Sequence, residues 1–150
     1  MKFTALQRCR NIGGGNSVNK SLDTCAILAY VIGEPIDQRD AAWKLFEKTD
    51  IIYHIPDLAI SEAVHVLETR YNYSRKEIAY HLNKFFVQNE DNLEYNCTLF
   101  WLVFPYYETH KALSFNDCMM AFYAQIGEAE PLLTFDRVLA KQHPSAKLIS

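Results

Sequence analysis

The sequence has few cysteines and no long uninterrupted apolar segment. Its four cysteines, spread over 150 residues, form no Cys-x-x-Cys pair. The N-terminal residues lack the continuous apolar stretch of a secretory signal. The most apolar run, residues 97–107, contains Pro105 and is too short to span a bilayer. We therefore expect reduced thiols in a cytoplasmic protein with no membrane association.

The chain also lacks a strong excess of charge of either sign. Its formal net charge of −3 argues against a general polyanion binder, so binding to nucleic acid would need a local basic patch. Residues 1–22 contain four basic residues and no acid, which leaves 11 bases and 18 acids for the remainder. An apolar share of 49% argues against disorder, and the length suits one domain with a single core.

Residues 1–18 are predicted to be an N-terminal extension outside the folded domain, which we place at residues 19–150. The glycines at positions 13–15 and the neighbouring asparagines are typical of a flexible link. We hypothesise that residues 1–17 are translated from a misassigned start or are a remnant added for expression.

The remaining sequence alternates short apolar segments with helical patterns. A strand is predicted to end near Asp23, with further strands at residues 51–58, 92–96, 131–135 and 146–150. Helices are predicted between them, including one that opens with a Ser74–Glu77 capping box and an apolar helix or helix pair at residues 97–112. Strands that are apolar on both faces predict a mostly parallel sheet covered by helices on both sides.

Four acids follow the predicted strands or open the predicted helices. Asp23 follows the first strand, and Glu62 lies in the first turn of the helix after the second strand. Asp117 opens a helix, and Asp136 ends the strand at residues 131–135. Each acid alone is explained by helix capping. In a parallel sheet, however, they would gather at one edge, where their mutual repulsion favours a bound cation. Clustered carboxylates suit Mg²⁺ or Mn²⁺.

Four segments together resemble the PIN-domain family, most closely its VapC-like toxins. They are SLDTCAILAYVIGE, IPDLAISEAVHVLE, LSFNDCMMAFYAQIG and LLTFDRVLAK, and the resemblance covers residues 19–150. It implies an α/β fold, a three-layer α/β/α sandwich with a central, mostly parallel sheet. It also implies Mg²⁺- or Mn²⁺-dependent cleavage of RNA.

The resemblance also assigns roles to individual residues. Asp23, Glu62, Asp117 and Asp136 would be the catalytic, metal-binding acids, and Thr24 and Thr134 would support them by hydrogen bonding. VapC-like members are commonly dimers silenced by a small antitoxin protein that inserts a peptide near the acids. Cys25 departs from the family pattern, in which serine is frequent, without removing a metal ligand.

Basic and aromatic residues suggest further surfaces. Arg70, Arg75, Lys76 and Lys84 form either a solvated helical face or a patch that steers RNA phosphates, and Arg137 could hold a phosphate beside Asp136. The aromatic run at residues 100–107 exceeds what one helix needs for a core, and we interpret the surplus as a homodimer surface.

Three functions remain open from the sequence. The first is a Mg²⁺- or Mn²⁺-dependent endoribonuclease, the toxin of a type II toxin–antitoxin pair. The second is a non-catalytic PIN-fold module that binds RNA or protein. The third, a structure-specific DNA nuclease, is disfavoured because the chain is too short for the extra helical arch of such enzymes.

Overall fold

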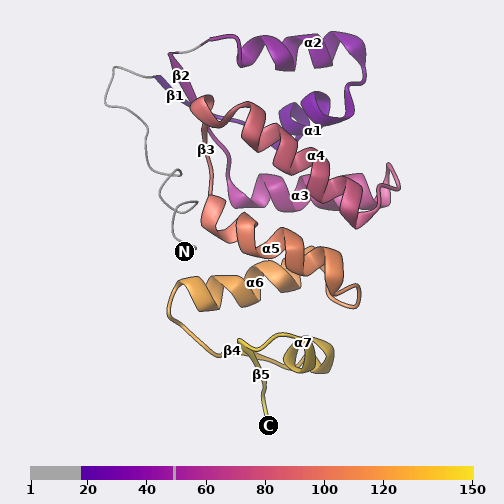
Figure 1. Ribbon diagram of the computed structural model, residues 1–150, viewed down its shortest axis with the longest axis vertical. Helices are drawn as coiled ribbons and strands as arrows, with labels where there is room; N and C mark the ends of the chain where they lie inside the picture. Colours follow the sequence, from indigo (N-terminus) through magenta and orange to yellow (C-terminus); the bar gives the residue numbers. More distant parts are fainter. Residues whose placement is uncertain (1–17, 49) are drawn as a thin grey trace. The chain divides into compact units, whose positions relative to one another are not determined.

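The computed structural model describes residues 18–48 and 50–150, and these form two compact units (Figure 1). The first unit ends at Asn96 and the second begins at Cys97. The predicted extension at residues 1–17 lies outside the described residues, so the hypothesis about its origin stays a prediction.

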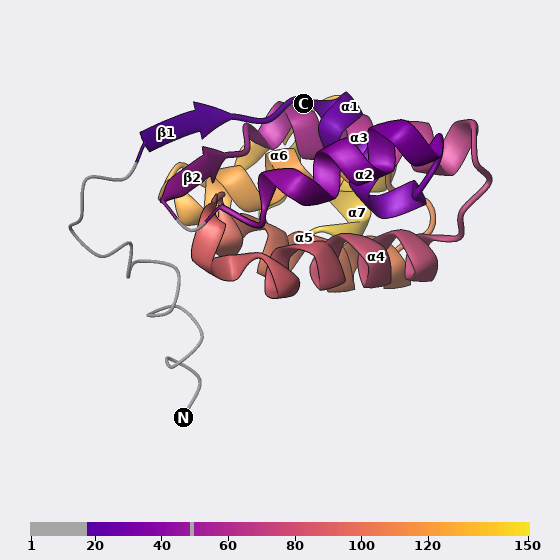
Figure 2. The ribbon, with the colours of Figure 1, turned by 90° about the horizontal axis from the view of Figure 1, so that it is seen from above.

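The first unit contains a three-stranded parallel sheet. Its strands are β1 (Val18–Ser21), β2 (Ile51–His54) and β3 (Leu93–Glu94), in the order β1-β2-β3. Figure 2 shows β1 and β2 running in the same direction. In the register, Val18 lies opposite Ile51. The parallel arrangement confirms the α/β class predicted from the sequence.

Burial in this sheet differs from the expectation of strands covered on both faces. The three apolar residues of the central strand β2 are buried, whereas every residue of β1 is exposed. The difference follows from composition, because β1 reads Val-Asn-Lys-Ser and has one apolar side chain to bury.

The described residues of the first unit also form five helical segments. They are α1 (Thr24–Ile32), α2 (Ile36–Leu45), α3 (Asp57–Thr69), α4 (Arg75–Gln88) and the short 3-10 helix η2 (Glu90–Asn92). The predicted capping box at the start of α4 is confirmed: the Ser74 hydroxyl accepts from the Glu77 N–H, and the Glu77 carboxylate accepts from the Ser74 N–H at 2.8 Å.

Aromatic side chains connect the helices of the first unit to its central strand. The rings of Tyr30, Phe46 and Phe85 contact one another edge to face, with centroids 4.9–5.7 Å apart. Phe46 also packs on Tyr53 of β2 at 5.2 Å. Such pairs add to the stabilisation from apolar burial, so the helices are held firmly on the sheet.

The second unit pairs two helices and adds a two-stranded parallel sheet. Its elements are α5 (Cys97–Thr109), α6 (Phe115–Ile126), β4 (Leu132–Thr134), α7 (Arg137–Gln142) and β5 (Ala146–Leu148). Leu132 of β4 lies opposite Ala146 of β5. The segment predicted as one helix or two is a single helix that continues through Pro105.

The strand before Asp136 is only partly buried, whereas its apolar sequence had suggested complete burial. Leu132 and Thr134 are partly covered, whereas Leu133 and Phe135 are 61% and 79% exposed. This alternation is that of a strand with one covered face. An unbroken apolar run does not reveal which of its residues point outward.

The aromatic run in α5 mostly fills the core, which corrects the expectation of a surplus. Phe100, Val103, Phe104 and Tyr107 share one helical face, and each is at most 1% exposed. The Phe115 ring of α6 packs against the three aromatic rings of this face at 5.2–6.4 Å. In residues 100–107 the large exposed apolar side chain is Trp101, at 69%.

The cysteines differ in state. Cys25 has an exposed thiol and Cys118 a buried one, whereas Cys97 is disulfide-bonded. The expectation of reduced thiols is therefore wrong for Cys97. Within the described residues, no helix is long and apolar enough to cross a bilayer.

A buried histidine lies between the helices of the second unit. His143 is 2% exposed, and its ring packs on Tyr106 and Phe122 with centroids 4.7 and 4.6 Å away. Its Nδ1 accepts a hydrogen bond from the Ser145 N–H at 3.1 Å, which places the proton of the neutral ring on Nε2. Burial lowers the pKa of His143, nearby His110 lowers it further, and Glu130 partly opposes them.

This lowered pKa predicts that mild acid destabilises the protein. The unfolded chain takes up a proton on His143 near pH 6.5, above the pKa in the folded chain. The contribution of His143 to stability is therefore complete above about pH 6.5 and is lost as the pH falls through the lower, folded-state pKa. His143→Asn keeps an acceptor for the Ser145 N–H and should flatten this part of the pH profile of urea unfolding.

The comparison rests on the slope of stability against pH, so an overall loss of stability in the variant does not obscure it. His65→Gln, at an exposed position of α3, is the matched control and should keep the slope of the wild type. Equal slopes for His143→Asn and the wild type would show that His143 does not couple folding to pH.

Candidate active site

Asp23 lies at the start of α1, directly after the first strand. The Leu22 N–H donates to the His54 carbonyl at 3.0 Å and so extends the sheet to the residue before Asp23. Asp23 is the exposed N-cap residue of α1, and its Oδ1 accepts from the Ala26 N–H at 3.0 Å. The capping interpretation of Asp23 is therefore correct, and it occupies one of the two carboxylate oxygens.

Glu62 is tied to the same helix start by Thr24. The buried Thr24 hydroxyl donates to Glu62 Oε2 at 2.6 Å and has a longer contact of 3.4 Å with the Ala59 carbonyl. Because Thr24 directly follows Asp23, this hydrogen bond holds the Glu62 carboxylate beside the N-terminus of α1. Glu62 lies in the second turn of α3, not in the first as predicted, because the helix already begins at Asp57.

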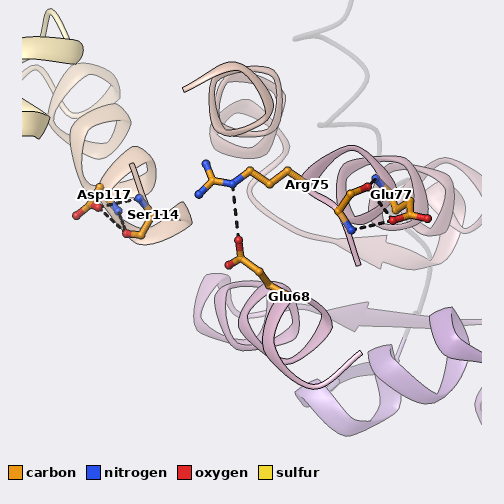
Figure 3. A network of polar contacts seen from close by, with 6 residues as sticks. Glu68, Arg75, Glu77, Ser114 and Asp117 are labelled. Atoms are coloured by element: carbon orange, nitrogen blue, oxygen red, sulfur yellow. Dashed lines mark hydrogen bonds and ion pairs between the residues drawn. The ribbon is translucent and has the colours of Figure 1, made fainter. Parts of the chain in front are cut away.

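Asp117 belongs to a capping box that opens α6 (Figure 3). Its Oδ2 accepts from the Ser114 N–H at 2.9 Å and from the Ser114 hydroxyl at 2.6 Å, and the Asp117 N–H donates back to the Ser114 hydroxyl oxygen. The role of Ser114 was missed in the sequence, although the Ser-x-x-Asp spacing is a variant of the capping-box signal. Both bonds use the same carboxylate oxygen, which leaves Oδ1.

Asp136 caps the short helix α7. Its Oδ1 accepts from the N–H groups of Val138 and Leu139 at 2.7 and 3.0 Å. The Thr134 hydroxyl oxygen accepts from the Asp136 N–H at 2.9 Å. Thr134 therefore fixes the backbone of Asp136, whereas Thr24 binds the carboxylate of Glu62 directly.

The three aspartates share one pattern of hydrogen bonding. Each uses a single oxygen to satisfy the N–H groups of a helix start, and its second oxygen accepts no hydrogen bond from the described residues. Nor does any Lys, Arg or His of the described chain form an ion pair with these aspartates or with Glu62. Capping therefore leaves an oxygen of each aspartate for a hard cation such as Mg²⁺.

The four acids are divided equally between the two units. Asp23 and Glu62 belong to the first, and Asp117 and Asp136 to the second. Across residues 18–48 and 50–150, no group of three or more His, Cys, Asp or Glu side chains is arranged to hold a metal ion. The shared metal site of all four acids stays a prediction.

The predicted basic residues differ in how available their charges are. Arg70 follows the end of α3, Lys76 and Lys84 lie on α4, and all three are exposed. Arg75 forms an ion pair with Glu68 at 3.6 Å, and its side chain is 20% exposed, so its charge is partly neutralised (Figure 3). Arg137 is the exposed first residue of α7.

Parallel strands connected by helices define an α/β protein, and Asp23, Asp117 and Asp136 lie at three of its helix starts. A comparison with protein families matches residues 21–143 to the PIN domain. The chain therefore belongs to the PIN domain family. A search of curated proteins found no match, and a search of solved structures found none either.

The family defines a general biochemical class. PIN domains are generally nucleases, and they typically use divalent metal ions. Membership also implies binding to RNA.

The hydrogen bond from Thr24 to Glu62 should stabilise the fold measurably. Thr24→Val keeps the shape of the side chain but removes the donor, and it should lower the free energy of unfolding by about 1–2 kcal/mol. Thr24→Ser, which keeps the hydroxyl, is the matched control. Urea denaturation of the three proteins provides the measurement, and a valine variant as stable as the serine variant would contradict this role.

Proposed function

We propose that this protein is a Mg²⁺- or Mn²⁺-dependent endoribonuclease that hydrolyses RNA phosphodiester bonds. The proposal depends on how Asp23, Asp117 and Asp136 are hydrogen-bonded in a chain of the PIN family. Each one stabilises a helix start through one oxygen and keeps its second oxygen for another ligand.

The donor set fits a hard divalent cation. Asp23, Asp117 and Asp136 would supply carboxylate oxygens, and Glu62 would contribute directly or through a water molecule. A bound Mg²⁺ or Mn²⁺ would make a water molecule easier to deprotonate and would neutralise negative charge on the phosphate. Thr24 positions Glu62, and Thr134 positions the backbone of Asp136. Hydrolysis would leave 5′-phosphate and 3′-hydroxyl ends.

Exposed basic residues would hold the RNA phosphates. Arg137 is adjacent in sequence to Asp136, and Arg70 and Lys76 lie near the turn between α3 and α4. Arg75 is assigned a smaller part than the sequence suggested, because Glu68 balances its charge. In an acidic protein, such local charges are required for attraction of a polyanion.

Removing the charge of one aspartate should abolish cleavage and preserve the fold. Asp23→Asn and Asp117→Asn keep an amide oxygen that can still cap the helix, but they lose the anionic ligand. With single-stranded RNA and Mn²⁺, both variants should cleave at least about a hundredfold more slowly than the wild type. Gel analysis of labelled RNA measures the rate, and circular dichroism verifies the fold.

Asp37→Asn is the matched control, because Asp37 is also an exposed acid in the first turn of a helix. It should cleave RNA at the wild-type rate. Wild-type cleavage by Asp23→Asn or Asp117→Asn would refute the assignment. A wild-type protein that binds RNA but does not cleave it with either metal would support the alternative, a non-catalytic RNA-binding module.

We further propose that the nuclease is the toxin of a type II toxin–antitoxin pair and forms a homodimer. The resemblance of the four segments to VapC-like toxins supports the toxin role. For the homodimer, the structure reduces the proposed α5 surface to the exposed Trp101 and its surroundings.

The partner proteins can be tested by purification. A small protein encoded next to this chain should co-purify with it and suppress its cleavage of RNA. The chain alone should sediment as a dimer, and Trp101→Lys should shift it to a monomer. A chain that sediments as a monomer would refute the homodimer, and a neighbouring protein without effect on cleavage would refute the antitoxin.

A further inference from the structure

Four aromatic rings form a continuous row around the turn between α3 and α4. Tyr71 contacts Tyr73 with ring centroids 6.5 Å apart, Tyr73 contacts His81 at 5.5 Å, and His81 contacts Tyr80 at 5.3 Å. The inner rings, Tyr73 and His81, are partly buried, whereas Tyr71 and Tyr80 at the two ends are 46% and 61% exposed. The exposed rings of Tyr71 and Tyr80 are therefore supported by contacts with the partly buried rings of Tyr73 and His81.

Basic side chains lie on the same face of α4 as Tyr80. Lys76 precedes Tyr80 by four residues and Lys84 follows it by four, so the three side chains form one stripe along the helix. All three are exposed. The helix contains three basic residues and one acid, in a chain whose net charge is −3.

Two acids close in sequence to this face have partners of their own. Glu68 pairs with Arg75, and Glu77 accepts hydrogen bonds from the Ser74 N–H and hydroxyl (Figure 3). The hydrogen bonds from Ser74 lower the pKa of Glu77, so it stays ionised but is held at the N-terminus of α4. Lys76 and Lys84 therefore give the stripe two exposed positive charges, with one ionised acid, Glu77, beside Lys76.

We propose that the stripe of Lys76, Tyr80 and Lys84, together with Tyr71, binds single-stranded RNA. Unpaired bases would stack on the exposed tyrosine rings, and the two lysines would contact phosphates on either side. Aromatic faces interleaved with positive charge recognise unpaired nucleic acid without strong sequence preference. This inference extends the proposed ribonuclease function, because it names unpaired RNA as the ligand and places a contact surface outside the four acids.

The chemistry of the stripe favours single strands over other partners. A duplex hides the faces of its bases, so it could use the lysines but not the tyrosines. An apolar protein surface would leave the two lysine charges without partners.

Binding should be measured in EDTA, so that the result does not depend on catalysis. Fluorescence anisotropy of a short fluorescein-labelled single-stranded RNA reports the affinity. Tyr80→Leu should weaken binding by about 5- to 100-fold, because it removes one stacking platform. Tyr80→Phe keeps the ring and should bind within about twofold of the wild type.

The salt dependence isolates the role of the lysines. In the double variant Lys76→Gln, Lys84→Gln, the slope of log affinity against log salt concentration should decrease by about 1.4, which corresponds to two lost phosphate contacts with a single strand. Lys44→Gln, an exposed lysine near the end of α2, is the matched control and should keep the wild-type slope. All substituted side chains are exposed, so the fold should be preserved.

The outcomes separate this inference from the proposed function. Three results would each overturn the proposed surface. In the first, Tyr80→Leu binds RNA as tightly as the wild type. In the others, the wild type binds an RNA duplex as tightly as the single strand, or does not bind the single strand in EDTA. If the wild type cleaves RNA but the Tyr80→Leu variant binds RNA as tightly as the wild type, the proposed surface is wrong and the ribonuclease function stands. Binding that depends on Tyr80 without any cleavage would overturn the ribonuclease and retain the surface.

Discussion

The unpaired N–H groups at the helix starts are the constraint on which the candidate site depends. The first turn of a helix has donors without intrahelical partners, and an aspartate at or near the N-cap satisfies them. In this chain Asp23, Asp117 and Asp136 each do so with a single oxygen. The requirement of the backbone therefore fixes where each carboxylate lies and how it is oriented, while its second oxygen stays available. Structural and functional explanations of these acids do not compete.

The same positions show how closely stability and chemistry are connected. Thr24 is buried in the packing between α1 and α3, yet its hydroxyl is bound to the exposed Glu62 carboxylate. A side chain fixed by the core thus determines the rotamer of an acid at the surface. A loosely held glutamate would lose more side-chain entropy on binding a cation.

Much of the fold could be predicted because local signals were strong. The capping box at Ser74, the helix after Asp23 and the α/β class follow from residue spacing alone. The errors arise where burial depends on the neighbours of an element. Leu133 and Phe135 belong to an apolar run but are exposed, because side chains alternate between the two faces of a strand and only the other face of this one is partly covered. Conversely, the aromatic run at residues 100–107 of α5 is buried by packing against Phe115, which lies eight positions after residue 107.

The candidate site was predictable in its residue types but not in its hydrogen bonds. Sequence spacing suggested Asp117, yet it could not show that both bonds from Ser114 fall on one oxygen. Likewise, the basic residues of α4 were visible in the sequence, but the partial neutralisation of Arg75, in contrast to the exposed Lys76, depends on the position of Glu68. A nuclease needs opposite charges for its two tasks, carboxylates to hold a cation and bases to attract the polyanion. In a protein of slight negative charge, that second task depends on a few exposed cations, such as Lys76 and Lys84 of α4, where Glu68 is already paired with Arg75.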